Sequence, residues 1–205
     1  VPPGLVEDPD YVRAQGVIDD ADTFDAAFFG YLPGDVEIMD PQHRLFLECA
    51  WAALEDAGYD PLAAPGLVGV FGGMSQSTYL PLLRAADPEG TRYGAYPLRL
   101  GTDKDYLTTR VSYKLNLRGP SMNVQTACST SLVAVCQACQ SLLAYQSDMA
   151  LAGGVAVGVP LRAGHHYHEG GIFSPDGHCR HFDAQAQGTV TGDGVGLVVL
   201  KRLGD

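Results

Sequence analysis

The chain has 205 residues, enough for one sizeable hydrophobic core, and 46% apolar with 18% charged residues predicts a globular rather than a disordered protein. The net charge of −11 argues against nucleic-acid binding, which needs a basic surface. No apolar run reaches membrane-spanning length, no signal segment is expected, and five scattered cysteines indicate a reducing, cytoplasmic setting.

The first third of the chain predicts a loop, a helix and a strand in that order. Residues 1–10 contain three prolines and no periodicity, which predicts a loop. Asp40 and Pro41 are typical of a helix start and Gly58 of a helix end, so a helix is expected between them. The short apolar run 66–73 ends in glycines and predicts a buried strand.

Charge is distributed unevenly along the sequence. The window from Arg84 to Arg118 holds seven basic and four acidic residues in a chain that is acidic overall. A local basic face can attract an acidic partner. Charge alone favours the simpler interpretation of an ordinary mixed surface.

The remaining sequence predicts more helices and strands. Residues 105–115 are amphipathic and are expected to be helical. The apolar run 149–159 predicts a strand covered on both faces, residues 160–187 a loop, and residues 195–200 another buried strand. Strands that alternate with helices predict an α/β layered fold.

Cys128 stands where the sequence predicts the change from a strand to a helix. The extended run 121–125 precedes it, and a pattern with apolar spacings of three and four begins at Leu132. The first N–H groups of a helix lack partners and carry partial positive charge, which favours a thiolate and provides a donor for an oxyanion. The pattern therefore indicates a nucleophile, with a buried, inert cysteine at a tight turn as the alternative.

Three other groups of residues receive structural interpretations. Five of the six histidines lie between His165 and His181 without a complete zinc-ligand spacing, so surface histidines are favoured over a metal site. One of them is also a candidate base for Cys128. Cys136 and Cys139 continue the apolar stripe of their helix and are expected in the core rather than as a redox pair. No glycine cluster completes a phosphate-binding motif.

Eight segments occur in an order and at spacings that are specific to one known family. They are Phe24–Gly30, Met39–Arg44, Ala53–Gly58, Asp103–Tyr106, Thr126–Ser131, Leu151–Gly154, Phe173–Gly177 and Gly194–Arg202. Together they resemble the ketosynthase domain of modular type I polyketide synthases, over nearly the whole chain. Cys128 falls on the acyl-accepting cysteine of that family.

The resemblance implies a thiolase-like, layered α/β/α/β/α fold that normally forms a homodimer. Residues 1–205 would be the N-terminal portion of one β-ketoacyl synthase domain among neighbouring polyketide synthase domains. It implies that Cys128 takes an acyl chain from the phosphopantetheine of an acyl carrier protein and that its backbone N–H binds the oxyanion. Decarboxylative Claisen condensation with a carrier-bound malonyl-type extender follows. Thr126 and Ala127 would bind substrate, with no cofactor or metal held by the domain itself.

The chain departs from the family pattern at both ends. The opening strand before Val1 is missing. So are two histidine motifs, of His-Gly-Thr and Asn-x-Gly-His type, and a lysine, all of which lie beyond the region equivalent to Arg202. The chain alone is therefore expected to supply the nucleophile but not the decarboxylation machinery, and to leave apolar faces uncovered. Gln125, where many relatives have aspartate, is interpreted as a subfamily variation.

Two alternative functions remain. The first is a non-catalytic fragment that dimerises through residues 121–125 or docks a carrier protein through the basic window, with Arg110 and Arg118 as candidate contacts. The second is a cysteine protease, which is disfavoured because the sequence around Cys128 lacks the context of such enzymes.

Overall fold

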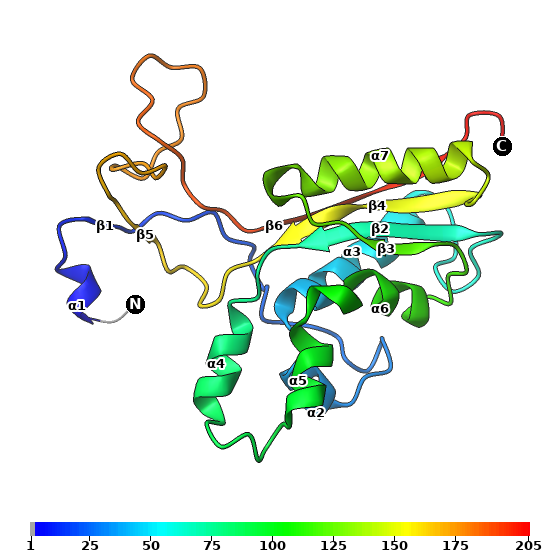
Figure 1. Cartoon of the computed structure of the whole chain (residues 1–205), viewed down its shortest axis with the longest axis horizontal. Coiled ribbons are helices and arrows are strands. Elements are labelled where there is room, and N and C mark those ends of the chain that lie inside the picture. Colours follow the sequence, from blue (N-terminus) through cyan, green and yellow to red (C-terminus); the bar gives the residue numbers. More distant parts are fainter. Residues whose placement is uncertain (1–2) are drawn as a thin grey trace. The chain divides into compact units, whose positions relative to one another are not determined.

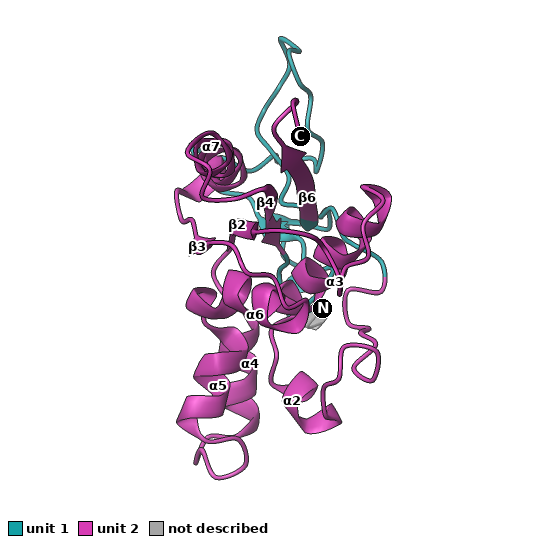
Figure 2. Ribbon diagram, turned by 90° about the vertical axis from the view of Figure 1, so that its right-hand side faces the viewer, with its two compact units in different colours: residues 1–19, 157–194 teal, residues 20–156, 195–205 magenta. Residues whose placement is uncertain are grey.

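The computed structural model describes residues 3–205, and the chain divides into two compact units, which Figure 2 shows in different colours. The first unit consists of residues 1–19 and 157–194. The second consists of residues 20–156 and 195–205 and contains Cys128.

A four-stranded sheet forms the centre of the second unit. Its strands, in the order β3-β2-β4-β6, are β3 (Ser121–Asn123), β2 (Val68–Met74), β4 (Met149–Ala156) and β6 (Gly194–Lys201). β2 runs parallel to both β3 and β4, and Val70 lies opposite Ser121 on one side and Leu151 on the other. The carboxyl ends of β2, β3 and β4 therefore meet at one edge of the sheet.

Helices cover both faces of this sheet (Figure 1). They are α7 (Thr130–Leu143) on one face, and α3 (Pro41–Asp56) and α6 (Leu107–Lys114) on the other. This arrangement confirms the layered α/β fold predicted from the alternation of strands and helices.

The helix α3 forms where Asp40, Pro41 and Gly58 predict it. The Asp40 carboxylate accepts a hydrogen bond from the Gln42 N–H at 2.9 Å, and Pro41 occupies the first helical position. Gly58 follows the helix with a φ of 81°, a left-handed conformation that glycine adopts without strain. Phe46 and the neighbouring apolar side chains of α3 are buried against the sheet.

The core between the sheet and α7 is built largely from alanine. Phe71 of β2 packs with a set of buried side chains from α7 and β4: Ala134, Ala138, Leu142, Ala150 and Ala152. Small side chains let a helix lie close to a sheet, so this contact excludes water without large residues. The buried strands expected at 66–73 and 149–159 are confirmed as β2 and β4.

A helical hairpin extends from the second unit below the sheet in Figure 1. It consists of α4 (Tyr79–Ala86) and α5 (Ala95–Thr102), and the shorter elements of the unit are α2 (Pro33–Glu37), the 3₁₀ turn η1 (Lys104–Tyr106) and the 3₁₀ turn η2 (Ala127–Ser129). The Asp87 carboxylate accepts the N–H groups of three residues in the hairpin loop, at 3.0 to 3.1 Å. Leu83 and Leu98 join the two helices in a small apolar cluster with Ile38.

The first unit is mostly irregular. Its elements are α1 (Pro3–Val6), β1 (Tyr11–Val12) and β5 (His165–His166), and β1 pairs with β5 in the antiparallel sense. The loop predicted for residues 1–10 is wrong at α1, and Val1 and Pro2 lie outside the described residues. The loop predicted for 160–187 is confirmed except at β5. Within the described part of the chain, none of the helices has the length and hydropathy needed to cross a bilayer.

Two apolar surfaces expected in the core are exposed. β6 alternates between exposed and half-buried positions, so the prediction of a fully buried strand is wrong. The exposed face of α7, called here the α7 stripe, consists of Leu132, Cys136, Cys139 and Leu143. The core position expected for the two cysteines is wrong because α7 turns Ala134 and Ala138 toward the sheet.

Candidate active site

The turn that carries Cys128 is built on the carboxyl ends of two parallel strands. After β3, Val124 donates its N–H to the Gly72 carbonyl of β2 at 2.9 Å. Residues 127–129 then form η2, and α7 begins at Thr130. Cys128 therefore lies between a strand and a helix as predicted, but in a separate 3₁₀ turn rather than in the first turn of the helix.

A glycine in β2 lets this turn lie directly against the sheet. A Cβ at Gly73 would collide with the Val124 carbonyl oxygen and would lie 2.5 Å from the Thr130 methyl carbon. On β4, a Cβ at Gly154 would lie 3.3 Å from the Ser131 Cβ. The strand glycines, which match no phosphate motif, thus make room for the turn.

The residue before Cys128 has a strained backbone. Ala127 has a φ of 53°, in the left-handed region that an alanine adopts at a cost of about 1 kcal/mol. Strained residues persist where surrounding contacts hold them, and they are frequent at functional sites. The neighbouring hydroxyls provide such contacts.

Three hydroxyl hydrogen bonds hold the turn in place. The Thr126 N–H donates to the Thr130 hydroxyl at 2.9 Å. The Ser129 hydroxyl lies 2.8 Å from the Thr126 carbonyl oxygen and 3.0 Å from the Thr126 hydroxyl. The small polar residues on both sides of the cysteine therefore fix the conformation of the turn itself.

Cys128 is exposed, so the alternative of a buried cysteine is wrong. Among the described residues, no hydrogen bond engages the Cys128 amide. An exposed thiol beside an available N–H group can attack a carbonyl carbon while the N–H accepts the developing charge on its oxygen.

A clamp connects α6 and η1 to the strand that leads to Cys128. The Asn123 side-chain oxygen accepts hydrogen bonds from the Thr108 N–H at 3.3 Å and the Thr108 hydroxyl at 3.2 Å. The Asn123 amide nitrogen donates to the Asp105 carbonyl at 2.7 Å. Asn123 therefore holds β3 five residues before the cysteine.

A second clamp holds the end of β2. The Gln42 side-chain oxygen, at the start of α3, accepts the Ser75 N–H at 3.1 Å and the Ser75 hydroxyl at 2.7 Å. Ser75 directly follows β2, so α3 fixes the chain where it leaves the sheet.

His43 is a structural residue and not a catalytic base. It is buried, its Nε2 lies 3.1 Å from the Asp103 carbonyl, and its Nδ1 accepts from Arg110 Nε at 3.4 Å. This geometry requires a neutral ring protonated on Nε2. Burial, reinforced by the Arg110 charge, lowers the pKa of His43 to about 3. Because His43 is the only histidine of the second unit, that unit offers no histidine base to Cys128.

The five clustered histidines belong to the first unit. The ring of His165 is buried between the carbonyl oxygens of Ala14 and Ser174, at 3.3 and 2.8 Å, and His166 lies 3.7 Å from the Asp8 carboxylate. Within residues 3–205, no group of histidine, cysteine or acidic side chains could hold a metal ion.

Internal contacts occupy part of the basic window. Arg110 donates to the Leu100 carbonyl at 2.5 Å and is partly buried. Lys114 donates to the carbonyls of Phe29 and Gly30, at 2.9 and 3.1 Å. Arg110 is therefore partly engaged by internal contacts, whereas Arg118 is exposed, and docking through either residue stays a prediction.

Sequence reasoning missed the two clamps and the strained Ala127. Asn123 and Thr108 are 15 residues apart, and Gln42 and Ser75 are 33 apart, so only the fold brings each pair together. The one available signal was local: a run of small residues on both sides of Cys128 indicated a tightly constrained turn.

Comparison with known proteins assigns a family to this arrangement. Residues 2–205 match the family described as beta-ketoacyl synthase, N-terminal domain. The chain is 54% identical over 203 residues to one of the phenolphthiocerol/phthiocerol polyketide synthase proteins of Mycobacterium tuberculosis. This match covers 96% of the chain but only 14% of the relative.

Solved structures give the same result. Ketosynthase twelve of the bacillaene polyketide synthase from Bacillus amyloliquefaciens is 39% identical with a TM-score of 0.89, and the match covers 100% of this chain and 36% of that one. The module 1 ketosynthase of the bacillaene synthase from the same species is 37% identical with a TM-score of 0.78. This match covers 92% of this chain and 33% of that one. The chain thus spans about a third of the solved ketosynthases that it resembles.

Proposed function

Because this chain belongs to the beta-ketoacyl synthase family and matches its N-terminal domain, we propose that it is the acyl-accepting part of a polyketide synthase ketosynthase domain, with Cys128 as the nucleophile. Residues 1–205 form one portion of that domain. The observation that supports this most directly is the exposed Cys128 on a fixed turn, at the end of the sheet and beside an available N–H group.

The proposed reaction begins with thioester exchange. The Cys128 Sγ, as a thiolate, attacks the thioester carbonyl of an acyl chain carried on phosphopantetheine. A tetrahedral oxyanion forms, and the Cys128 N–H donates to it. As the oxyanion collapses, the new Sγ–C bond remains, the bond to the pantetheine sulfur breaks, and that sulfur leaves as a thiol after taking a proton. Thr126 and Ala127, which flank the cysteine on the strand side, form the adjoining wall of the acyl site.

The condensation step follows in the complete domain. The acyl-enzyme meets a carbanion that decarboxylation of a carrier-bound malonyl-type extender generates, and a C–C bond forms as the Cys128 thioester breaks. The second unit holds no histidine that can assist decarboxylation, because His43 is buried and neutral. The second unit by itself is therefore expected to accept an acyl group without extending it.

The partners follow from the same proposal. The substrates arrive on the phosphopantetheine of acyl carrier proteins, neighbouring polyketide synthase domains surround the complete ketosynthase, and the setting is cytoplasmic. No cofactor is held by this part of the domain. The carrier-protein and neighbouring-domain assignments are supported by the family and by the polyketide synthase relatives.

A structural role is the second candidate, and one observation favours it. β3 is the edge strand of its sheet, and Met122 on it is 51% exposed. An edge strand with an exposed apolar side chain is suited to pairing with a second copy, which would give the homodimer. Sedimentation equilibrium of the parent chain and the Met122→Lys variant tests this: pairing through β3 requires that the parent dimerises and that the variant does so more weakly.

The acyl-transfer proposal is tested by intact-mass measurement after incubation with an acyl N-acetylcysteamine thioester. The parent should gain one acyl group, and Cys128→Ala should gain none. Cys179→Ala, which removes another exposed thiol, is the matched control and should be acylated like the parent. Equal labelling of the parent and Cys128→Ala would contradict the proposal.

A further inference from the structure

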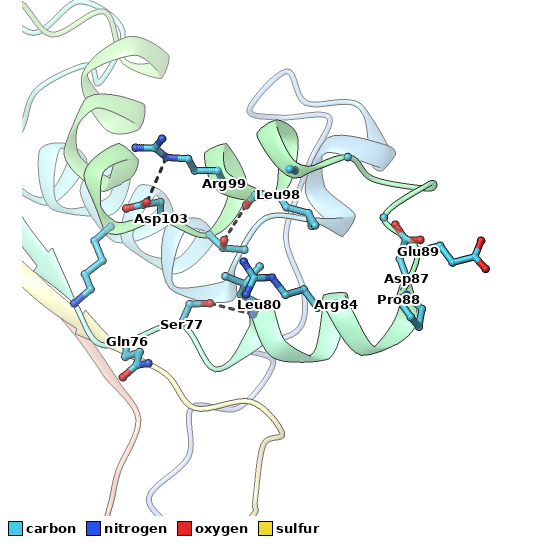
Figure 3. A pocket seen from close by; sticks show the side chains of 15 residues that line it. Gln76, Ser77, Leu80, Arg84, Asp87, Pro88, Glu89, Leu98, Arg99 and Asp103 are labelled. Atoms are coloured by element: carbon cyan, nitrogen blue, oxygen red, sulfur yellow. Dashed lines mark hydrogen bonds and ion pairs between the residues drawn. The ribbon is translucent and has the colours of Figure 1, made fainter.

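A large cavity lies between the two helices of the hairpin. It has a volume of about 930 Å³, and α4, α5, the loop between them and the turn after β2 line it (Figure 3). Ligand-binding cavities typically measure about 300 to 1,000 Å³. No part of the acyl-transfer site described above occupies this cavity.

The cavity begins at the edge of the sheet that holds Cys128. Gln76, which lines it, is the second residue after β2 ends at Met74. Because β2 and β3 are parallel, the chain leaves both strands at the same edge, and the Cys128 turn follows β3. At its other end the cavity extends along α4 to Pro88 and Glu89 of the loop.

The walls of the cavity combine apolar side chains with three cations, Arg84, Arg99 and Lys104, of which Arg99 lies 3.6 Å from Asp103. The apolar lining consists of Leu80, Pro88, Ala95 and Leu98. Arg84 follows Leu80 by one helical turn on α4, and Figure 3 shows its side chain directed toward α5. Among the described residues, neither the exposed Arg84 side chain nor the Lys104 side chain has a hydrogen-bond or ion-pair partner.

The acidic residues of the lining do not neutralise Arg84. The Asp87 carboxylate already accepts hydrogen bonds from three backbone N–H groups. Asp103 accepts the Asp105 N–H and lies 3.6 Å from Arg99. The Glu89 carboxylate points away from the helices in Figure 3. A guanidinium only donates hydrogen bonds, so a ligand that replaces the water around the exposed Arg84 would contact it through oxygen acceptors.

We propose that this cavity holds the acyl chain destined for Cys128, and that Arg84 selects chains with a keto, hydroxyl or carboxylate oxygen remote from the thioester. This inference rests on the acyl transfer proposed above. Arg84 is five residues beyond the start of α4 at Tyr79, which at 1.5 Å per residue is about 7.5 Å along the helix. In this proposal the apolar walls contact the alkyl segment of the chain, and Arg84, one helical turn beyond Leu80, contacts its remote oxygen.

Binding is measured first, independently of any reaction at the cysteine. The Cys128→Ala chain is titrated, with detection by ¹H–¹⁵N NMR, with an octanoyl N-acetylcysteamine thioester and with its analogue that carries a keto group near the far end. The keto analogue should bind about tenfold more tightly and shift amides of residues 76–104. Arg84→Ala should remove this preference, Arg84→Lys should retain part of it, and Arg162→Ala, in the first unit, should keep it. Shifts confined to other residues, or equal affinities of the two probes, would overturn the inference.

Acylation rates of the parent chain with the same two thioesters provide the second measurement. A preference for the keto analogue that Arg84→Ala reduces about tenfold supports the inference. If both thioesters acylate Cys128 at equal rates, the acyl-transfer function stands and the role of Arg84 is rejected. If neither acylates a folded parent chain while the binding preference persists, the acyl-transfer function fails, and the cavity remains a site for oxygenated acyl chains.

Discussion

Asn123 accepts two hydrogen bonds from Thr108, one from its N–H and one from its hydroxyl, and so ties α6 to the strand that leads to Cys128. The third bond of Asn123, to the Asp105 carbonyl, uses its amide nitrogen. Aspartate could not make all three bonds, because an ionised carboxylate has no donor for the Asp105 carbonyl.

Replacing Asn123 by alanine should therefore destabilise the chain and slow acylation. The loss of three hydrogen bonds, two of them partly buried and one exposed, should lower the free energy of unfolding by about 2 kcal/mol, measured by urea denaturation. Gln140→Ala, an exposed amide on α7, should change it by less than about 0.5 kcal/mol. Identical stability of the two variants would show that the Asn123 clamp is unimportant.

Gly73→Ala should disturb the Cys128 turn. The added Cβ meets the Val124 carbonyl, which is backbone and cannot rotate away, so the turn must move. Acylation of Cys128 should fall by about tenfold or more, because the N–H and Sγ no longer have a fixed relative position. The control is Gly194→Ala, where an added Cβ meets no atom within 4 Å. Circular dichroism of both variants separates a displaced turn from a failure to fold.

His43 should make the chain less stable as the pH falls below neutrality. The folded pKa of about 3 lies below the ordinary value of 6.5, so between these values the unfolded chain binds more protons. The stabilisation is fully present above pH 6.5 and is lost as the pH falls toward 3. The free energy of unfolding should thus drop by about 1 kcal/mol per pH unit in this window.

Urea denaturation at pH 7.5 and pH 5.0 checks this dependence. His43→Gln should be less stable at pH 7.5 but should lose less stability on acidification. His181→Gln, an exposed histidine, should keep the parental slope. An unchanged slope in His43→Gln would mean that another group causes the pH dependence.

The cysteines should differ in their rates of alkylation by iodoacetamide. Cys128, Cys136, Cys139 and Cys179 are exposed and should react readily, whereas Cys49 is half-buried. Burial also raises the pKa of the Cys49 thiol, which lowers its thiolate fraction at neutral pH. Peptide mass mapping over time should show Cys49 as the slowest site, and alkylation of Cys49 as fast as that of Cys136 would contradict the burial of its side chain.

Local signals were sufficient for the elements that carry the site. Asp40, Pro41 and Gly58 marked the two ends of α3, and the change of periodicity around Cys128 placed it between a strand and a helix. These features depend on residues that are close together in the sequence, so they can be predicted without knowledge of the tertiary structure. The family resemblance also rested on ordered local segments.

Features that depend on tertiary packing were predicted less well. An apolar stripe shows that a face can be buried, but not that anything covers it, and this is why Cys136 and Cys139 were assigned to the core. Arg110 was counted as a surface charge because its partners, His43 and the Leu100 carbonyl, are brought to it by folding. The cavity that contains Arg84 lies between α4 and α5. No sequence pattern specifies how these two helices are placed relative to each other, so the cavity could not be predicted.

The α7 stripe makes assembly of this chain directly observable. Its two thiols, Cys136 and Cys139, are three residues apart on one exposed face, between Leu132 and Leu143. Any polypeptide that packs along this face must shield both thiols together, whereas a partner that binds the β3 edge leaves them reactive. Protection of both Cys136 and Cys139 from alkylation would thus indicate a polypeptide packed on α7, as completion of the layered fold requires. Two reactive thiols in an assembled protein would instead indicate pairing of two sheets through β3.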